Sequence, residues 1–223
     1  MNTIISILII VTSFSHMDNG DSTGVWLEEF AIPYMEFKDQ NFEITVASIS
    51  GGNVPIDPRS LPNEKQKIQW EEPLSVLQHS VRLEGVNLSK YDAVYIPGGH
   101  GAMFDFPTDP TIKKVLENFA KDNKLIASVC HGPASLVNIN LPDGTALVKG
   151  KKVTSFTNQE EFAGTLEKQM PFLLETELKN RGAIFISKEN WADHIEVDGN
   201  LITGQNPSSS KSIAKAIIDK LKK

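Results

Sequence analysis

Cys130 is the residue whose type and setting best suit covalent chemistry. It is the only cysteine of the 223-residue chain, and it directly follows the apolar run Ile126-Ala-Ser-Val129. A lone cysteine after an apolar strand is usually a buried core residue with no chemical role. The continuation His131-Gly132-Pro133, however, favours a strand that turns sharply into a helix. A helix N-terminus favours a thiolate, and its N–H groups can stabilise an oxyanion. The pattern therefore predicts a cysteine nucleophile on a strand-to-helix elbow, with His131 beside it.

A glycine-rich turn follows a second apolar run and has the sequence Pro97-Gly98-Gly99-His100-Gly101. Glycines let the backbone approach a substrate closely and direct N–H groups at it. The spacing matches neither a P-loop nor a dinucleotide-binding fingerprint, so it does not indicate phosphate binding. We expect Gly98, Gly99 and His100 to form the substrate and oxyanion side of the site.

Glu28 and Glu29 place carboxyl groups at the start of a helix that is expected after the first strand. Acidic residues in a first helical turn ordinarily complement the helix dipole. In a parallel sheet, however, this segment should lie beside the cysteine elbow. A carboxyl kept protonated by burial there would donate a hydrogen bond to the thiolate and lower the pKa of the thiol. The scattered histidines show no metal-ligand spacing, so we expect no metal, and the chemistry requires no organic cofactor.

The elements that would position these residues alternate between strand and helix. Strands are expected at residues 4–11, 42–48, 93–96, 125–129, 152–156 and 183–187, with a hairpin at 195–197 and 201–203. Helices are expected at 110–123, 169–180, 208–221 and 27–38, the last with a kink or an early break at Pro33. Residues 51–88 are the least regular stretch, with room for a short helix. The alternation predicts an α/β fold with a mostly parallel sheet, helices on both faces and a site at the carboxyl ends of the strands.

Length and charge narrow the class of protein. The chain suits one domain, 1–223, and its net charge of -6 without a basic run argues against nucleic-acid binding. One cysteine permits no internal disulfide, which fits a reducing compartment, and we expect a cytoplasmic protein. The apolar run 4–10 is too short to span a membrane and has no basic residue before it, so we expect a first buried strand there and no secretion signal.

Four motifs together resemble the ThiJ/PfpI superfamily, also described as class I glutamine amidotransferase-like, and within it the heat-shock-31-like branch that includes glyoxalase III. They are the segment 130–133, the turn 98–101, the spacing from Glu29 to Pro33, and the tail Ile202-Thr-Gly-Gln-Asn-Pro-Ser-Ser209. The resemblance covers nearly the whole chain. It implies a flavodoxin-like three-layer sandwich that is usually a homodimer.

The resemblance also implies roles for individual residues. Cys130 matches the nucleophile of the family and His131 the adjacent histidine of its triad. Glu29, rather than Glu28, matches the carboxyl that contacts the cysteine sulfur. Glu161 matches the triad acid, although the neighbouring Glu160 is an open alternative.

The activity implied by this resemblance is that of a glutathione-independent glyoxalase. It would convert methylglyoxal, a small 2-oxoaldehyde, to lactate through a cysteine hemithioacetal, as a lyase of the D-lactate dehydratase type with an additional deglycase activity. Gly99 and the His131 N–H match the oxyanion hole. Two alternatives stay open: a cysteine peptidase or amidase of the PfpI type, and a stress-response holding chaperone or cysteine oxidation sensor. We expect neither nucleic acid nor membrane as a partner.

Overall fold

A seven-stranded sheet forms the centre of the structure, a computed structural model that describes residues 4–223. Its strand order is β3-β2-β1-β4-β5-β9-β8, and only β8 runs antiparallel to its neighbour. The strands are β1 (Ser6–Val11), β2 (Glu43–Ser48), β3 (Val81–Arg82), β4 (Ala93–Ile96), β5 (Leu125–Val129), β8 (Ile195–Asp198) and β9 (Leu201–Gly204). The predicted α/β class, the mostly parallel sheet and the hairpin around Gly199 are confirmed.

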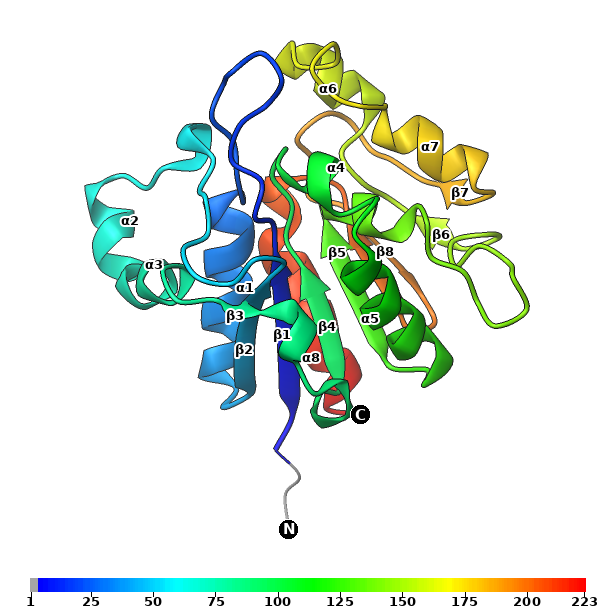
Figure 1. Ribbon diagram of the computed structural model, residues 1–223, viewed down its shortest axis with the longest axis horizontal. Helices are drawn as coiled ribbons and strands as arrows, with labels where there is room; N and C mark the ends of the chain where they lie inside the picture. The colour runs from blue at the N-terminus through cyan, green and yellow to red at the C-terminus, as the bar shows by residue number, and fades with distance from the viewer. Residues whose placement is uncertain (1–3) are drawn as a thin grey trace.

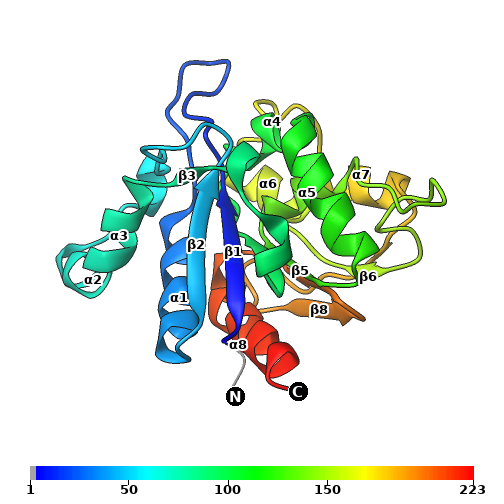
Figure 2. The ribbon, with the colours of Figure 1, turned by 60° about the horizontal axis from the view of Figure 1, so that its bottom comes forward.

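Helices cover both faces of this sheet (Figures 1 and 2). α1 (Leu27–Asp39) and α8 (Ser210–Leu221) lie together on one face, and α5 (Pro110–Lys121) lies on the other. Side chains along β1 alternate between the two cores: Ile7 and Ile9 pack with α1 and α8, and Leu8 and Ile10 pack with α5. A strand that is buried on both faces must be apolar throughout, and this accounts for the continuous apolar run near the start of the chain.

Several expected elements differ in length or place. The strands expected at 152–156 and 183–187 shorten to β6 (Lys152–Val153) and β7 (Ile184–Phe185), which pair with each other outside the central sheet. The helix expected at 169–180 begins only at α7 (Leu174–Asn180). A capped helix that was not expected, α6 (Asn158–Gly164), lies between these segments. The remaining helices are α2 (Glu64–Gln69), α3 (Glu71–Leu77) and α4 (Ala102–Asp105), and short 3₁₀ turns occur at Pro58–Ser60, Leu83–Gly85, Leu88–Lys90, Gly132–Leu136 and Pro207–Ser209.

Pro33 does not break α1, which continues as an α-helix for 13 residues. Proline has no N–H to donate to the carbonyl four residues earlier, which here is that of Glu29. The Tyr95 hydroxyl of β4 donates to this carbonyl instead, at 2.7 Å, in a fully buried environment. The expected early break is therefore wrong, because the neighbouring strand satisfies the acceptor that Pro33 leaves free.

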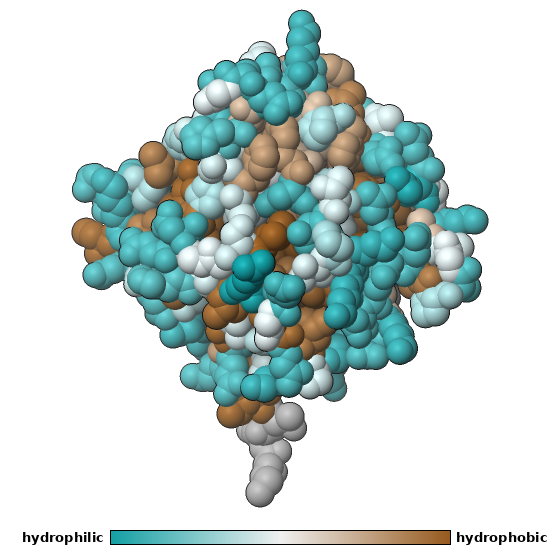
Figure 3. All heavy atoms as spheres, in the orientation of Figure 1, coloured by the Kyte–Doolittle hydropathy of each residue, from teal (hydrophilic) through white to brown (hydrophobic). Residues whose placement is uncertain are grey.

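The surface is mixed in character. On the face drawn in Figure 3, hydrophilic side chains cover most of the rim and apolar ones show between them. The large apolar side chains that are exposed come from separate segments: Ile4, Leu61, Ile68, Val81, Phe162, Ile184, Trp191 and Val197. Within residues 4–223, no helix is both long and apolar enough to cross a membrane.

Candidate functional site

Cys130 occupies a sharp elbow directly after β5. Its backbone φ is +59°, a left-handed conformation that non-glycine residues adopt rarely and mostly where the surroundings enforce it. The Cys130 N–H donates to the carbonyl of Gly204, and the Phe156 N–H donates to the Cys130 carbonyl, both at 2.9 Å. Gly132 lets the chain pass close to β4, because a Cβ there would lie 2.4 Å from the Ile96 oxygen. These contacts fix the sulfur at the carboxyl end of the sheet.

His131 and Glu161 complete a hydrogen-bonded line with this cysteine. The His131 Nδ1 lies 3.3 Å from the Cys130 Sγ, and the His131 Nε2 lies 2.7 Å from the Glu161 Oε2. All three residues are buried. Burial raises the pKa of the Glu161 carboxyl, but its interactions with the His131 and His100 rings, which include a hydrogen bond from each, outweigh burial and hold that pKa well below its usual range. Glu161 is therefore an ionised acceptor for the His131 N–H.

Glu160 lies beside Glu161 on α6 but points into a different set of contacts. Its Oε1 accepts hydrogen bonds from the Trp191 N–H, the Gln205 side-chain amide and the Asn206 side-chain amide, at 2.8, 3.1 and 2.8 Å. Its Oε2 accepts from the N–H of Thr157, at 2.9 Å, as part of a capping box. The geometry thus distinguishes the two neighbouring acids that the sequence left open, because only Glu161 contacts His131.

Glu29 reaches the same place from the first turn of α1. It is fully buried, and its Oε2 accepts the Gly98 N–H at 2.7 Å. Its Oε1 has no hydrogen-bond partner within residues 4–223, and the Cys130 thiol is near enough to the carboxyl to influence its pKa. Burial raises the pKa of Glu29 to about 8, while the Cys130 thiol and the Gly98 N–H act in the opposite direction. A carboxyl whose pKa is raised in this way keeps its proton to higher pH than an exposed glutamate does.

The thiol pKa differs from the sequence-based expectation. Burial raises the pKa of Cys130 well above its ordinary value, and the negative charge of Glu29 raises it further. The segment after the elbow is a 3₁₀ turn of five residues, Gly132–Leu136, and not an α-helix with an extended dipole. The Gly99 N–H acts in the opposite direction but does not outweigh burial. The shift of the thiol pKa is therefore opposite to the expected one, because burial and the charge of Glu29 outweigh the Gly99 N–H.

The glycine turn 98–101 lines the elbow from β4. A Cβ on Gly98 would lie 2.6 Å from the His131 nitrogen and 2.9 Å from the Glu29 Oε2, so only glycine fits this approach. The Gly98 N–H is used by Glu29 and is not free for a substrate oxygen, contrary to its expected role. The N–H groups of Gly99 and His131 donate to no backbone carbonyl within residues 4–223, and these two remain the candidates for an oxyanion hole.

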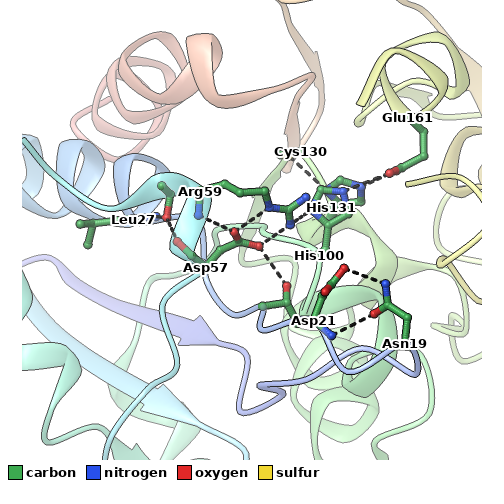
Figure 4. A network of polar contacts seen from close by, with 11 residues as sticks. Asn19, Asp21, Leu27, Asp57, Arg59, His100, Cys130, His131 and Glu161 are labelled. Atoms are coloured by element: carbon green, nitrogen blue, oxygen red, sulfur yellow. Dashed lines mark hydrogen bonds and ion pairs between the residues drawn. The ribbon is translucent and has the colours of Figure 1, made fainter. Parts of the chain in front are cut away.

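His100, from the same turn, belongs to a polar network that the sequence did not suggest (Figure 4). Its Nε2 lies 3.0 Å from the Glu161 Oε1, and its Nδ1 lies 2.9 Å from the Arg59 Nη2. Arg59 in turn holds the buried Asp57 through its Nε at 2.8 Å. Arg59 lies in the irregular stretch 51–88, and its one local signal is the Asp57-Pro58 pair that caps its 3₁₀ turn.

His100, His131 and Glu161 are also the one group within residues 4–223 whose ligand atoms lie close enough to hold a metal ion, all within 4.8 Å. Both carboxylate oxygens of Glu161 already bind an imidazole, and the Arg59 guanidinium donates into the group. A cation would have to displace these hydrogen bonds next to a positive charge. The contacts therefore favour a hydrogen-bonded network over a metal site.

Taken together, the fold and these side chains define an α/β protein with a buried cysteine elbow, an adjacent histidine and two carboxyl groups at the carboxyl ends of its strands. A model of the DJ-1/PfpI family matches residues 22–220, and the chain belongs to this family.

Named relatives and solved structures agree with this assignment. The chain is 28% identical to the glutathione-independent glyoxalase hsp3101 of Schizosaccharomyces pombe, over 95% of this chain and 94% of that protein. It superposes on the glyoxalase III structure from Candida albicans with a TM-score of 0.87 at 28% identity, covering 96% of each chain. It also superposes on the rapid encystment protein of 24 kDa from Francisella tularensis with a TM-score of 0.92 at 35% identity, covering 98% of this chain and 99% of that one.

Proposed function

We propose that this protein is a glutathione-independent glyoxalase that converts methylglyoxal to lactate. One observation carries the proposal: a buried Glu29 carboxyl lies near the Cys130 thiol, and the His131–Glu161 pair adjoins the same sulfur. Relatives that match most of the chain are named glutathione-independent glyoxalases, which supports the same activity here. The protein supplies its own thiol, so the reaction needs no glutathione.

The first step is addition of the Cys130 sulfur to the aldehyde carbon of methylglyoxal. A neutral His131 ring that donates its Nε2–H to the Glu161 carboxylate carries a lone pair on Nδ1, and this lone pair faces the thiol. His131 takes the thiol proton as the carbon–sulfur bond forms and returns it to the aldehyde oxygen, which becomes the hydroxyl of a hemithioacetal. The N–H groups of Gly99 and His131 are placed to stabilise the oxygen while it is negatively charged.

The second step moves a proton between adjacent carbons. A base removes the hydrogen from the hemithioacetal carbon, an acid returns a proton to the neighbouring carbon, and the hydroxyl proton passes to the oxygen of that neighbouring carbon, which leaves a lactoyl thioester on Cys130. Glu29 and His131 are the groups for this transfer, and a Glu29 pKa of about 8 lets it both accept and donate near neutral pH. Water then hydrolyses the thioester, releases lactate and restores the thiol. The overall change is addition of one water molecule to methylglyoxal, with no oxidant or reductant.

The finer features belong to the same proposal. We assign the reaction to the lyases of the D-lactate dehydratase type and infer a homodimer, as the family resemblance implies. We also infer one domain over residues 1–223 from the chain length and a cytoplasmic location from the single cysteine. A hydrolase of the PfpI type would use the same nucleophile on an acyl carbon, but the names of the relatives favour the glyoxalase. Nothing in the relatives' names favours a chaperone or an oxidation sensor.

Lactate formation from methylglyoxal in the absence of glutathione tests the proposal. The wild type should form lactate, Cys130→Ala should form none, and Glu29→Gln should lose at least about a hundredfold in kcat because it removes the acid–base group. Glu28→Gln is the matched control, since Glu28 is the neighbouring carboxyl on α1 and does not contact the thiol; it should keep most of the activity. A folded wild type that forms no lactate would overturn the glyoxalase assignment.

A further inference from the structure

The protons on His100 can be assigned from its neighbours. A guanidinium has donors only, so the contact of 2.9 Å between the Arg59 Nη2 and the His100 Nδ1 requires a lone pair on that ring nitrogen. A neutral imidazole with an unprotonated Nδ1 carries its proton on Nε2. That proton points at the Glu161 Oε1, 3.0 Å away. The donor and acceptor types therefore assign a single neutral tautomer to His100.

Glu161 is held from both sides as a result. The His100 ring donates to its Oε1 and the His131 ring to its Oε2, and the two ring centroids lie 4.1 Å apart. A carboxylate with one donor on each oxygen has its plane fixed. Without the His100 donor, one oxygen of a buried, ionised Glu161 would lack a partner and would turn to find one.

Arg59 is itself held in place before any substrate arrives. Its Nε donates to the Asp57 Oδ1 at 2.8 Å, and its Nη2 contacts the Asp57 Oδ2 as well. Asp57 is fully buried, accepts the Thr23 hydroxyl at 3.0 Å, and caps the 3₁₀ turn that carries Arg59. An arginine fixed by a planar fork to a carboxylate presents the second N–H of its Nη2 in a set direction, which a lysine would not do.

We propose that Arg59 and His100 are positioning residues, in which Arg59 fixes the His100 tautomer and His100 thereby orients Glu161 and His131 toward the Cys130 thiol. This inference rests on the proposed role of Cys130, His131 and Glu161 as the reacting group. It assigns a function to Arg59, which is 39% exposed at its side chain and lies in a segment with no recognisable motif.

The charges around His100 support a neutral ring. Burial, the adjacent His131 and the Arg59 guanidinium lower the pKa of His100 to about 4, and Glu161 acts in the opposite direction. The groups that face it are Arg59 from the 3₁₀ turn, Glu161 from α6 and His131 from the elbow, with Asp57 behind Arg59. His100 thus keeps the same protonation state throughout the neutral range.

Nitrogen NMR of the histidine rings tests the tautomer directly. The chain has only five histidines, so the spectrum of ¹⁵N-histidine-labelled protein is small enough to assign with single substitutions. Wild-type His100 should show a protonated Nε2 and an unprotonated Nδ1 at pH 7. In Arg59→Met the Nδ1–H tautomer should appear, and Arg59→Lys should largely restore the original form because its ammonium can still donate. A wild-type His100 with a protonated Nδ1 would overturn the proposal.

The consequence for Cys130 is measured in the same variants by its alkylation with iodoacetamide and by kcat. Arg59→Met should slow both by about tenfold to a hundredfold with little change in KM, since it misplaces the reacting group without removing it. Arg59→Lys should retain an intermediate rate. Arg82→Met, which removes an exposed arginine paired with Glu84, is the matched control and should behave like the wild type.

These readouts separate the inference from the proposed function. If the wild type forms no lactate, the glyoxalase assignment fails. The His100 tautomer and the alkylation rate of Cys130 still decide whether Arg59 and His100 position Glu161 and His131. If Arg59→Met changes neither the tautomer nor the alkylation rate, the positioning role is refuted, whatever the activity of the wild type.

Discussion

At the scale of single residues, the central feature is a thiol and a carboxyl that share one buried environment. Burial raises the pKa of both Cys130 and Glu29; Glu29 raises the thiol pKa further, whereas the thiol lowers the pKa of Glu29. Both groups therefore hold their protons to higher pH than exposed side chains of the same type. His131, whose Nδ1 faces the sulfur, is placed to take the thiol proton only when a substrate carbon is there to bond with the sulfur.

Substitution of Glu29 should lower the pKa of Cys130. Glu29→Gln removes the negative charge that the carboxyl carries above about pH 8, and that charge is one cause of the raised thiol pKa. The pH dependence of alkylation by iodoacetamide, or of thiolate absorbance, measures the shift, with Glu28→Gln as the control. A higher thiol pKa in Glu29→Gln would instead mean that the protonated carboxyl stabilises the thiolate by donating to it.

The residues of the site were not equally predictable. Cys130, His131 and Glu29 stand in short motifs where a strand or a helix begins or ends, and the structure brings all three together. Glu160 and Glu161 could not be separated by sequence, because the choice depends on which face of α6 points at His131. Arg59 was missed because it meets His100 from a segment 41 positions earlier that contains no regular pattern.

At the scale of elements, α1 shows how a helix defect positions a functional group. Pro33 frees the carbonyl of Glu29, and the Tyr95 hydroxyl on β4 fills the gap at 2.7 Å. The backbone of Glu29 is thereby tied to the strand that leads into the glycine turn. Its side chain accepts a hydrogen bond from the Gly98 N–H of that same turn, so Glu29 is held both at its backbone and at its carboxyl group.

Loss of this hydroxyl should reduce stability and activity together. Tyr95→Phe leaves a buried carbonyl unpaired, so the free energy of unfolding should fall by about 1–3 kcal/mol, as measured by urea denaturation, and kcat should fall with it. Tyr91→Phe is the control, because it removes a hydroxyl that donates to Thr45 elsewhere in the sheet. This variant can lose stability but should keep the wild-type kcat.

A second substitution separates this contact from a packing effect. Pro33→Ala supplies an N–H that can donate to the Glu29 carbonyl within the helix, so the double variant Pro33→Ala, Tyr95→Phe should regain much of the loss. If it does not, the hydroxyl acts by some route other than the freed carbonyl.

The sequence predicted the central elements better than the peripheral ones for a physical reason. Strands buried on both faces and the amphipathic α5 carry a pattern set by the core. β6 and β7 pair only with each other, and α6 is held by a capping box and contacts to distant loops. Such segments take their conformation from tertiary contacts that a local pattern does not encode.

At the scale of the whole molecule, the parallel sheet gathers residues that are far apart in sequence at one end of the strands. Glu29 follows β1, the glycine turn follows β4, Cys130 follows β5, and α6 brings Glu161 over the elbow. A site of this kind concentrates buried ionisable groups, and global stability must then depend on pH.

The pKa of Glu29 predicts the sign of that dependence. Between its ordinary value of 4.5 and about 8, the folded protein keeps a proton on Glu29 that the unfolded chain has lost. The unfolded state therefore binds fewer protons, and the contribution of Glu29 to stability falls as pH rises through this window, with a slope of at most about 1.4 kcal/mol per pH unit.

Urea denaturation from pH 5 to pH 8.5 measures this contribution as the difference between wild type and Glu29→Gln. The variant should gain stability relative to the wild type as pH rises, because an amide cannot ionise. Glu71→Gln, which changes an exposed glutamate on α3, should run parallel to the wild type. A difference between wild type and Glu29→Gln that does not vary with pH would contradict the raised pKa.

Glu160 connects α6 to two other segments, so α6 cannot move away from His131 alone. It joins the first turn of α6 to the loop at Trp191 and to the tail at Gln205 and Asn206. Glu161 occupies the next position on the same helix. A fluctuation that withdraws α6 from His131 has to release the loop at Trp191 and the tail at Gln205 and Asn206 in the same event, so these segments should exchange their amide hydrogens as one cooperative block.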